Sequence, residues 1–264
     1  MDMKLVSLNI WGAKMGTAFT EFVEEQKSST DIFCFQEVFN SPRTDIPESG
    51  ETRIHIFEEL KAILPDFSAE FFPIQKGLDL NGDVDFEVEV GHAIFVRTST
   101  PIISSGQVFT RGKRDGGKRG EGWQNIPTAL SYVRIPFGKR MLSVLNFHGI
   151  PFPADKLDTE ARLEQSRRIL EFLEGEKGEI ILAGDFNLMP DTESVSMFEP
   201  LLRNLIKEYD ITMTRSEINP YYGTPEQQNF ADYTFVSKGI AVSNFTVPAD
   251  CVASDHLPMI LEFS

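Results

Sequence analysis

The chain has 264 residues, of which 41% are hydrophobic and 11% aromatic, and its formal net charge is −15 at pH 7. A chain of this size and composition can bury a large core, which excludes a disordered or low-complexity protein, and we expect one domain over residues 1–264. The charge excludes a protein that holds long duplex nucleic acid by neutralising many phosphates, because so acidic a surface repels them.

The N-terminal residues are too polar for the apolar region of a signal peptide, and no stretch of sequence reaches the length of a membrane-spanning helix. We therefore expect a cytoplasmic protein with no transmembrane segment. The two cysteines, Cys34 and Cys251, are too few for a disulfide framework, and their apolar neighbours predict buried thiols.

Apolar segments rich in β-branched and aromatic residues recur along the chain and predict strands. In chain order they are residues 5–10, 32–36, 84–90, 93–96, 130–135, 142–147, 180–183, 233–236 and 257–261. Between Val84 and Val90 apolar and acidic residues alternate, which predicts a strand with one face on a core and one face in water.

Helical spacing of apolar residues appears in segments 19–23, 54–64 and 163–173. In the third segment Asp158 or Thr159 can cap the start, and Gly175 follows the end. Its polar side contains three arginines, Arg162, Arg167 and Arg168. This helix leads into the strand at 180–183, and such a unit is typical of a mixed α/β fold.

The sequence predicts a long loop at residues 110–127, and a short stretch of it is rich in basic residues and glycine. The basic residues are Arg111, Lys113, Arg114, Lys118 and Arg119. The glycines favour a mobile, solvated loop, whereas the charges favour a loop that grips one or two substrate phosphates. Both interpretations stay open at the level of sequence.

Polar side chains stand again and again at the ends of the predicted strands. They are Asn9, Glu37, His148, Asp185 with Asn187, Asp232, and Asp255 with His256. One such terminus can be an ordinary turn, since Asp and Asn tolerate turn backbone. Burying such groups without partners costs roughly 2–7 kcal/mol each for neutral polar groups, so their recurrence predicts a shared site at one rim of the fold.

The ligand chemistry of these residues is that of hard oxygen atoms, with no cysteine and few histidines. This favours Mg²⁺, with Mn²⁺ as a substitute, over zinc. Because Mg²⁺ keeps several waters and takes only one or two carboxylates, Glu37 and Asp255 would suffice as ligands. A divalent ion can polarise a phosphoryl oxygen while a carboxylate orients or deprotonates water, which predicts phosphoester hydrolysis.

The same residues resemble, in order and approximate spacing, the endonuclease/exonuclease/phosphatase superfamily, whose deoxyribonuclease I-like members are metal-dependent phosphoesterases. The resemblance spans residues 5–263, and the Gly-Asp-x-Asn and Ser-Asp-His motifs are specific in combination. The matching segments are Asn9, Gln36-Glu37, Asn146-Phe147-His148, Gly184-Asp185-Phe186-Asn187, Asp232-Tyr233 and Ser254-Asp255-His256. The superfamily includes deoxyribonucleases, abasic-site endonucleases, tyrosyl-DNA phosphodiesterases, inositol-polyphosphate phosphatases and bacterial sphingomyelinases.

The resemblance implies an α/β (α+β) fold: a four-layer αββα sandwich of two mostly antiparallel sheets packed face to face, with outer helices and the site at one end. It implies that Glu37 is the principal metal ligand, with Asn9 and Asp255 beside it. It also implies that Asp185 positions or activates the attacking water, with help from Asn187.

For the imidazoles, the resemblance implies that His256 stabilises charge on the five-coordinate phosphorus while Asp232 holds its ring. His148 is similar to a second histidine that contacts phosphate or assists the leaving group in the deoxyribonuclease and sphingomyelinase branches. His92 stands where the family has an amide, which would give it a phosphate-facing role. Where abasic-site endonucleases have a second acid near the first asparagine, this chain has Trp11, which speaks against that branch.

Together these features predict a Mg²⁺-dependent phosphoric ester hydrolase that acts by in-line attack of water. We expect a phosphodiester of nucleic-acid or nucleotide type as substrate, no stable binding of long duplexes, and a monomer. The alternatives are a sphingomyelinase-like or inositol-phosphate and lipid-headgroup phosphoesterase, and a non-catalytic binding module on the same fold.

Overall fold

The computed structural model describes residues 2–46 and 51–264, and its framework is a pair of six-stranded sheets. The first sheet has the strand order β13-β14-β1-β2-β6-β3. Its strands are β1 (Met3–Asn9), β2 (Ile32–Asn40), β3 (Phe67–Lys76), β6 (Glu89–Arg97), β13 (Val242–Thr246) and β14 (Met259–Phe263). Most neighbours are antiparallel, whereas β1 and β2 run parallel.

The second sheet has the strand order β11-β12-β10-β9-β8-β7. Its strands are β7 (Ser104–Arg111), β8 (Thr128–Phe137), β9 (Arg140–His148), β10 (Glu179–Asp185), β11 (Leu202–Asn204) and β12 (Asp232–Ser237). Here β9 and β10 are the parallel neighbours. A small hairpin of β4 (Leu78–Asp79) and β5 (Gly82–Asp83) lies outside both sheets.

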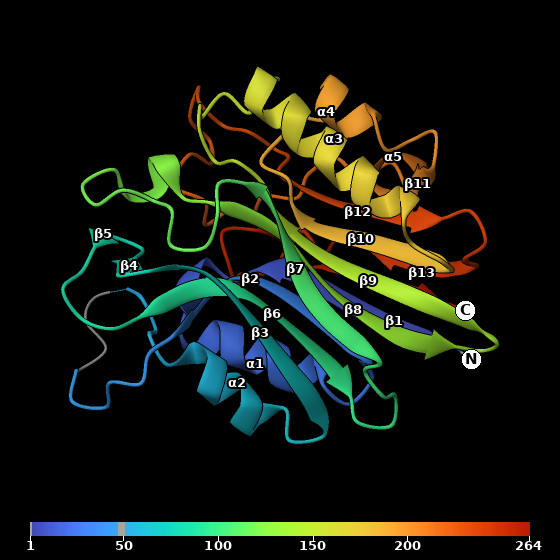
Figure 1. Cartoon of the computed structure of the whole chain (residues 1–264), viewed down its shortest axis with the longest axis horizontal. Helices are drawn as coiled ribbons and strands as arrows, with labels where there is room; N and C mark the ends of the chain where they lie inside the picture. The colour runs from blue at the N-terminus through green and yellow to red at the C-terminus, as the bar shows by residue number, and fades with distance from the viewer. Residues whose placement is uncertain (1, 47–50) are drawn as a thin grey trace.

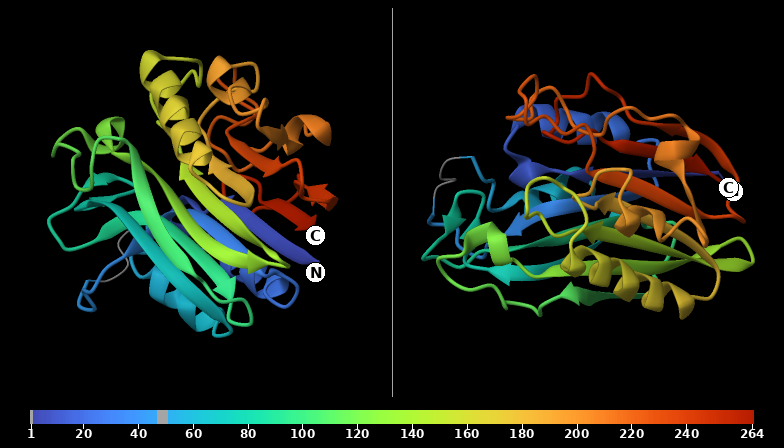
Figure 2. Two further views of the ribbon diagram at one scale, coloured as in Figure 1. Left: turned by 45° about the vertical axis from the view of Figure 1, so that its right-hand side comes forward. Right: turned by 90° about the horizontal axis from the view of Figure 1, so that it is seen from above.

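Helices cover the outer face of each sheet (Figure 1). They are α1 (Thr17–Gln26), α2 (Ile56–Ile63), α3 (Glu160–Glu174), α4 (Glu193–Ser196) and α5 (Leu205–Glu208), with short 3₁₀ turns η1 (Trp11–Ala13) and η2 (Gly122–Asn125). Figure 2 shows α1 and α3 on opposite sides of the two stacked sheets. The predicted four-layer αββα sandwich is therefore confirmed.

The side-chain alternation of the strands divides the apolar core into two clusters. On β1 and β2, Leu5 and Cys34 belong to the cluster that also contains Val144 and Leu145 of the opposite sheet. Their neighbours along the chain, such as Phe33, instead belong to the cluster that contains the apolar faces of α1 and α2. Because successive side chains point to opposite faces of a strand, both faces of this sheet are buried, which explains the unbroken apolar runs in its sequence.

The segment predicted as a strand at residues 84–90 is not one: residues 84–88 form no ladder, and β6 begins only at Glu89. Burial still alternates along this segment, with Val88 buried and Glu87 exposed. Two backbone hydrogen bonds to Gly77 hold this segment. The Gly77 N–H donates to the Val88 carbonyl at 2.8 Å, and the Val84 N–H donates to the Gly77 carbonyl at 3.0 Å. The alternating pattern therefore predicted correctly which side chains are buried, but the prediction that they form a strand is wrong.

The predicted boundaries of α3 are confirmed, and Thr159 Oγ1 accepts the Arg162 backbone N–H at 3.2 Å as its cap. The expectation that Arg162 lies on the polar side is wrong, because its side chain is 1% exposed. Its guanidinium donates to the carbonyls of Ile150, Pro153 and Leu157 at 3.2, 2.6 and 2.5 Å. This arginine therefore joins the loop at residues 150–157 to the helix.

Among the described residues, 2–46 and 51–264, no helix has both the length and the apolar character needed to cross a membrane. Cys34 is buried, as predicted, and burial raises the pKa of its thiol, whereas Cys251 is partly exposed.

Candidate active site

The second sheet brings three of the predicted side chains to one edge. His148 ends β9 and Asp185 ends β10, and these residues are paired across the parallel ladder. Asp232 begins the antiparallel strand β12 and is paired with Asp185 on its other side. The register of the backbone therefore places one imidazole and two carboxylates side by side.

The first sheet supplies the opposite wall. Asn9 ends β1, and Ser254 Oγ donates to its carbonyl at 2.6 Å, which ties the Ser254–His256 segment to this strand end. Glu37 lies on β2 where the ladder with β6 shifts register between Phe35 and Val38, and its φ is 56°. Such a bulge re-aims a side chain, and here it directs the Glu37 carboxylate towards Asn9.

The Asn9 amide connects the two walls. Its Nδ2 donates to Glu37 Oε1 at 2.9 Å and to Asp185 Oδ2 at 3.0 Å. Deeper between the sheets, the amide of Asn146 accepts from Gln36 Nε2 at 2.6 Å and donates to the Phe35 carbonyl at 2.9 Å. The motif amides thus lock the two sheet edges together beneath the carboxylates.

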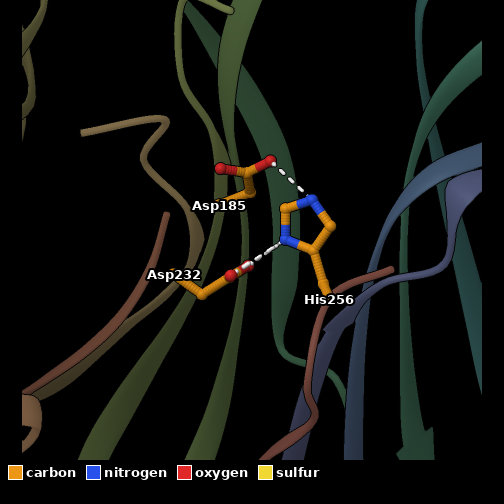
Figure 3. Close-up of side chains that lie close together, drawn as sticks. All are labelled: Asp185, Asp232 and His256. Carbon is orange, nitrogen blue, oxygen red and sulfur yellow. Dashed lines mark hydrogen bonds and ion pairs between the residues drawn. The ribbon is translucent and has the colours of Figure 1, made fainter. Parts of the chain in front are cut away.

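The His256 ring lies between two carboxylates, as Figure 3 shows: Nδ1 is 2.8 Å from Asp232 Oδ2, and Nε2 is 3.7 Å from Asp185 Oδ2. Burial and the nearby Arg215 lower the pKa of His256, but Asp232, Asp255 and Asp185 outweigh them and raise it to about 9. The ring therefore carries a proton on each nitrogen at neutral pH.

His148 has the opposite character. Its Nε2 is 3.5 Å from Asp185 Oδ2 and 3.8 Å from Glu37 Oε1, but burial lowers the pKa of this imidazole to about 4 in spite of Asp185. One histidine of the site is thus charged and the other is neutral at pH 7. Two titratable groups whose pKa values are pushed apart can take different roles in one reaction.

Asp185 contacts Asn9, Asn187 and both histidines of the site. Burial alone would raise its pKa, but His256, His148, Arg215 and Lys156 lower it to about 2. Its Oδ1 accepts the backbone N–H of Asn187 at 2.8 Å, and Asn187 has a φ of 55°, so this amide residue closes the turn after β10 and fixes the carboxylate.

Glu37 shows how well the site suits a cation. Burial, followed by repulsion from Asp255 and Asp185, raises the pKa of this carboxyl to about 7, although the Asn9 hydrogen bond lowers it. A divalent ion beside Glu37 and Asp255 would compensate for this repulsion, and carboxylate and amide oxygens are the ligands that Mg²⁺ prefers. The donor set therefore fits the predicted ion.

A second group of possible ligands lies beside the first and shares no residue with it. Asp185, Asp232 and His256 each offer one ligand atom, and these atoms lie within 4.8 Å of one another, so the three residues could hold a metal. However, Asp232 already holds His256 Nδ1, and the ring is protonated. A doubly protonated imidazole has no lone pair for a metal, so this group suits an ion less well than Glu37 and Asp255 do.

Three further polar residues border the site and were not predicted from the sequence: Lys156, Arg215 and Asn219. Lys156 Nζ donates to Asn187 Oδ1 and, at 2.8 Å, to the Pro151 carbonyl; burial lowers its pKa to about 8. Asp255 Oδ2 accepts from Arg215 Nη1 at 3.3 Å and from Asn219 Nδ2 at 3.0 Å. All three lie in loops outside the strand ends, and no spacing marks them.

His92 is buried next to His148, and the phosphate-facing role that the resemblance implies for it stays a prediction. It is 0% exposed, its Nδ1 lies 3.0 Å from Ser131 Oγ, and its ring centroid is 6.3 Å from that of His148. The residue lines a small cavity together with Glu37 and His148. Trp123, which could have stacked a base, donates to the Asp79 carbonyl at 2.9 Å and is part-buried.

The basic segment is not part of this cluster. Arg111 ends β7 and donates to Asn125 Oδ1 at 2.8 Å. Arg114 is paired with Glu89, Arg119 with Asp85, and Lys118 with Glu121 at 3.8 Å. Lys113 is exposed. Four of these five side chains therefore contact nearby acids and Asn125.

An αββα sandwich with a buried cluster of carboxylates, amides and imidazoles at one end is the arrangement that the resemblance to phosphoesterases implies. Residues 6–256 match the model of the Endonuclease/Exonuclease/phosphatase family, and the chain belongs to this family. All three activities in that name break phosphoester bonds, so the chain is a phosphoesterase of this family.

Similar proteins support the fold over the whole length. A mannosyl-6-phosphatase of Bacteroides thetaiotaomicron superposes with a TM-score of 0.71 at 19% identity and covers 99% of both chains. The catalytic domain of human Nocturnin superposes with a TM-score of 0.67 at 19% identity and covers 100% of this chain and 93% of that one. These likenesses show the fold alone.

A curated relative found by sequence aligns with only part of the chain. The UPF0294 protein of Vibrio campbellii is 27% identical over 146 residues, which are 54% of this chain and 48% of that protein. The chain therefore spans about half the length of this curated relative.

Proposed function

We propose that this protein is a Mg²⁺-dependent phosphoesterase that hydrolyses a phosphodiester of nucleic-acid or nucleotide type by in-line attack of water, without a covalent intermediate. The observation that carries the proposal is the environment of Asp185. One carboxylate is fixed by Asn9 and Asn187 and lies within 3.7 Å of the Nε2 atoms of both histidines.

Asp185 can orient a water molecule. With a pKa of about 2 it is ionised throughout the neutral range and accepts a hydrogen bond from water. A base with so low a pKa removes a proton poorly before attack, so alignment of the water is its larger contribution. Asn187 keeps the carboxylate from turning, because its backbone N–H occupies Oδ1 at 2.8 Å.

His256 can stabilise the charge that develops on phosphoryl oxygens. Its Nδ1–H is occupied by Asp232 at 2.8 Å, so the Nε2–H is the proton left to face the reacting group. A donor that is already oriented costs little reorganisation during the reaction, which makes such groups effective in buried sites. Neutral His148, on the other side of Asp185, can bond to the phosphate or the leaving oxygen.

Glu37 and Asp255 would hold the divalent ion, with Asn9 beside them. When bound, the ion would supply Lewis-acid polarisation of the phosphoryl oxygen and neutralise negative charge. Asn219 and Arg215 keep Asp255 in place through its Oδ2 atom at 3.0 and 3.3 Å. The chain's own residues thus fix the ligand geometry on the sheet edge.

The direct test is hydrolysis of bis(4-nitrophenyl) phosphate with Mg²⁺. We expect Asp185→Asn to lower kcat by about 10²–10⁴-fold, because the amide no longer aligns or deprotonates water, while the melting temperature stays near that of the wild type. Addition of EDTA should abolish turnover, and Mg²⁺ or Mn²⁺ should restore it. Normal turnover by the variant, or full activity in chelator, would contradict the proposal.

A lipid-headgroup phosphoester is the second candidate. Phe152, Tyr221 and Tyr222 are exposed on the loops that follow β9 and precede β12, and exposed aromatics suit a membrane surface. The net charge of −15 opposes binding to anionic lipid. Parallel assays of oligonucleotides, nucleotide diesters, inositol phosphates and sphingomyelin would separate these substrates, and a preference for sphingomyelin would overturn the nucleotide assignment.

We also propose that residues 1–264 form one domain. The first and last strands of the described chain, β1 and β14, are paired neighbours in the same sheet, with Met3 opposite Phe263. Limited proteolysis that releases a stable fragment would contradict this.

A further inference from the structure

A cleft of about 490 Å³ opens beside the candidate active site. It lies between two loops, residues 150–157 after β9 and residues 214–230 before β12. Gln228 Nε2 donates to the Ala154 carbonyl and joins the two loops. Because Arg162 holds the carbonyls of Ile150, Pro153 and Leu157, the first loop is tied to α3. The cleft is therefore built by anchored loops, and its volume is that of a small-molecule site.

The floor of the cleft is shared with the candidate active site. Lys156, Arg215 and Asn219 line the cleft. Each of them also bonds to a site residue, Lys156 to Asn187 and the other two to Asp255. An isolated antiparallel bridge to His256 fixes the backbone of Arg215. A phosphate held by the Lys156 and Arg215 cations would therefore lie next to Asp185 and His256.

The walls of the cleft are largely apolar and include two exposed aromatic side chains. Phe152 is 43% exposed on one loop, and Tyr221 is 57% exposed on the other. Single exposed aromatics are ordinary, but two that line one hollow among polar residues form the kind of apolar patch that marks a binding site. Glu226, also in the lining, offers carboxylate oxygens to amino or hydroxyl groups.

We propose that this cleft binds the nucleoside part of the substrate, with the base against Phe152 and Tyr221 and its phosphate directed at Lys156 and Arg215. The inference rests on the proposed phosphoesterase function and adds the substrate's nucleoside as the recognised group. Aromatic side chains stack on the face of any base, so the cleft selects nucleosides with little regard to sequence.

Two features favour a nucleoside over other occupants. A sugar ring places only C–H groups against an aromatic side chain and keeps its hydroxyl groups polar, whereas a planar base stacks its whole π-face on it. A membrane surface would have to meet a hollow rimmed by Asp155 and Glu226, and those carboxylates repel anionic lipid. A nucleoside phosphate matches all three features, because its base can cover the aromatic walls, its phosphate can meet the two cations, and its size suits the hollow.

The test uses adenosine, which has no phosphoester and binds without being hydrolysed. In calorimetric titrations of the whole protein we expect adenosine to bind measurably and ribose to bind at least tenfold more weakly. Phe152→Ala and Tyr221→Ala should each weaken adenosine binding about tenfold or more, since stacking is lost. Tyr222→Ala is the matched control, because Tyr222 is also exposed but does not line the cleft.

Hydrolysis gives the second arm of the test. Phe152→Ala and Tyr221→Ala should lower kcat/KM for a dinucleotide about tenfold while leaving that for methyl 4-nitrophenyl phosphate within about twofold. Equal losses on both substrates would overturn the inference, because they would mean that these residues serve the site and not the nucleoside.

The outcomes also separate this inference from the proposed function. If bis(4-nitrophenyl) phosphate is hydrolysed but adenosine does not bind, the cleft assignment is wrong and the phosphoesterase proposal survives. If adenosine binds but Asp185→Asn retains normal turnover, the cleft assignment survives and the proposed function fails. Equal effects of Tyr221→Ala and Tyr222→Ala, or retention of the protein on zwitterionic vesicles through Tyr221 and Phe152, would overturn the cleft assignment.

Discussion

The strand-end cluster and the basic segment at residues 111–119 are both conspicuous in the sequence, but only the residues of the cluster come together at one site. Most cluster residues come from β1, β2, β9, β10 and β12 and converge because hydrogen-bonded ladders fix where these strands lie, whereas Asp255 and His256 come from the segment before β14. The basic residues lie on a connection, where Arg114 and Arg119 pair with the nearby acids Glu89 and Asp85. A local charge run, unlike a strand end, does not specify its partner.

The largest effect that would sharpen this comparison is expected from His256→Ala. Loss of the oriented Nε2–H should lower kcat about 10²–10³-fold, with KM changed much less, because the donor acts chiefly on developing charge. His55→Ala is the control, since His55 lies at the start of α2 and bonds to the Ser41 carbonyl. Steady-state assays measure both, and equal activities of the two variants would contradict the role of His256.

A smaller loss is expected from Asp232→Asn. The amide would no longer orient the His256 ring as a carboxylate does, and loss of such a supporting partner commonly costs about 10–100-fold in activity. Asp66→Asn, at an exposed loop position, controls for the loss of one negative charge. If Asp232→Asn matched the wild type in kcat, the 2.8 Å contact between Asp232 and His256 would have no part in catalysis.

His92 lies inside β6 and not at a strand end, and we expect its replacement to change the pH dependence of stability. Burial lowers the pKa of His92 to about 3, below the value of 6.5 expected when unfolded. Between these values the unfolded chain binds the proton more readily, so the free energy of unfolding falls as the pH falls below 6.5. From pH 6.5 to 5 the wild type should lose about 2 kcal/mol more than His92→Gln, since each pKa unit corresponds to about 1.4 kcal/mol.

Urea unfolding at the two pH values provides the measurement for His92. His55→Gln is the matched variant and should keep the acid sensitivity of the wild type. Identical acid sensitivity of His92→Gln and the wild type would show that the buried imidazole contributes no pH dependence.

The smallest effect is expected from the basic segment. Replacement of Arg111, Lys113, Arg114, Lys118 and Arg119 by serine should change KM for a dinucleotide by less than about twofold, because their partners are local acids and Asn125. The single change Lys156→Met should raise KM about tenfold by comparison. A tenfold rise for the five-residue variant would instead restore the interpretation of this segment as a phosphate-gripping loop.

Much of the sandwich could be predicted because its central strands are buried on both faces and appear as continuous apolar runs. The edge strands β3, β7, β11 and β13 could not be, since β3 contains exposed positions such as Ser68 and Lys76, and β7 is largely half-buried. An edge strand is stabilised by one neighbour and needs no strongly apolar sequence.

The candidate site was predictable to the extent that its residues follow strands. Asn9, His148 and Asp185 each end a strand, and Asp232 begins one, so a pattern of polar termini identifies them. Lys156 and Arg215 had no such signal. Their positions depend on how long loops fold back, through contacts such as that between Lys156 and Pro151, and these contacts leave no periodic trace in the sequence.

The pairing of β1 with β14 sets both ends of the described chain beside each other, as the N and C marks of Figure 1 show. Met3 lies opposite Phe263 at one end of this pair, whereas Asn9 reaches the candidate active site at the other end. A tag, linker or reporter attached at either terminus would therefore extend away from the candidate active site. The same neighbourhood makes this molecule suitable for circular permutation, because a short peptide could join the old ends without crossing the entrance for substrate.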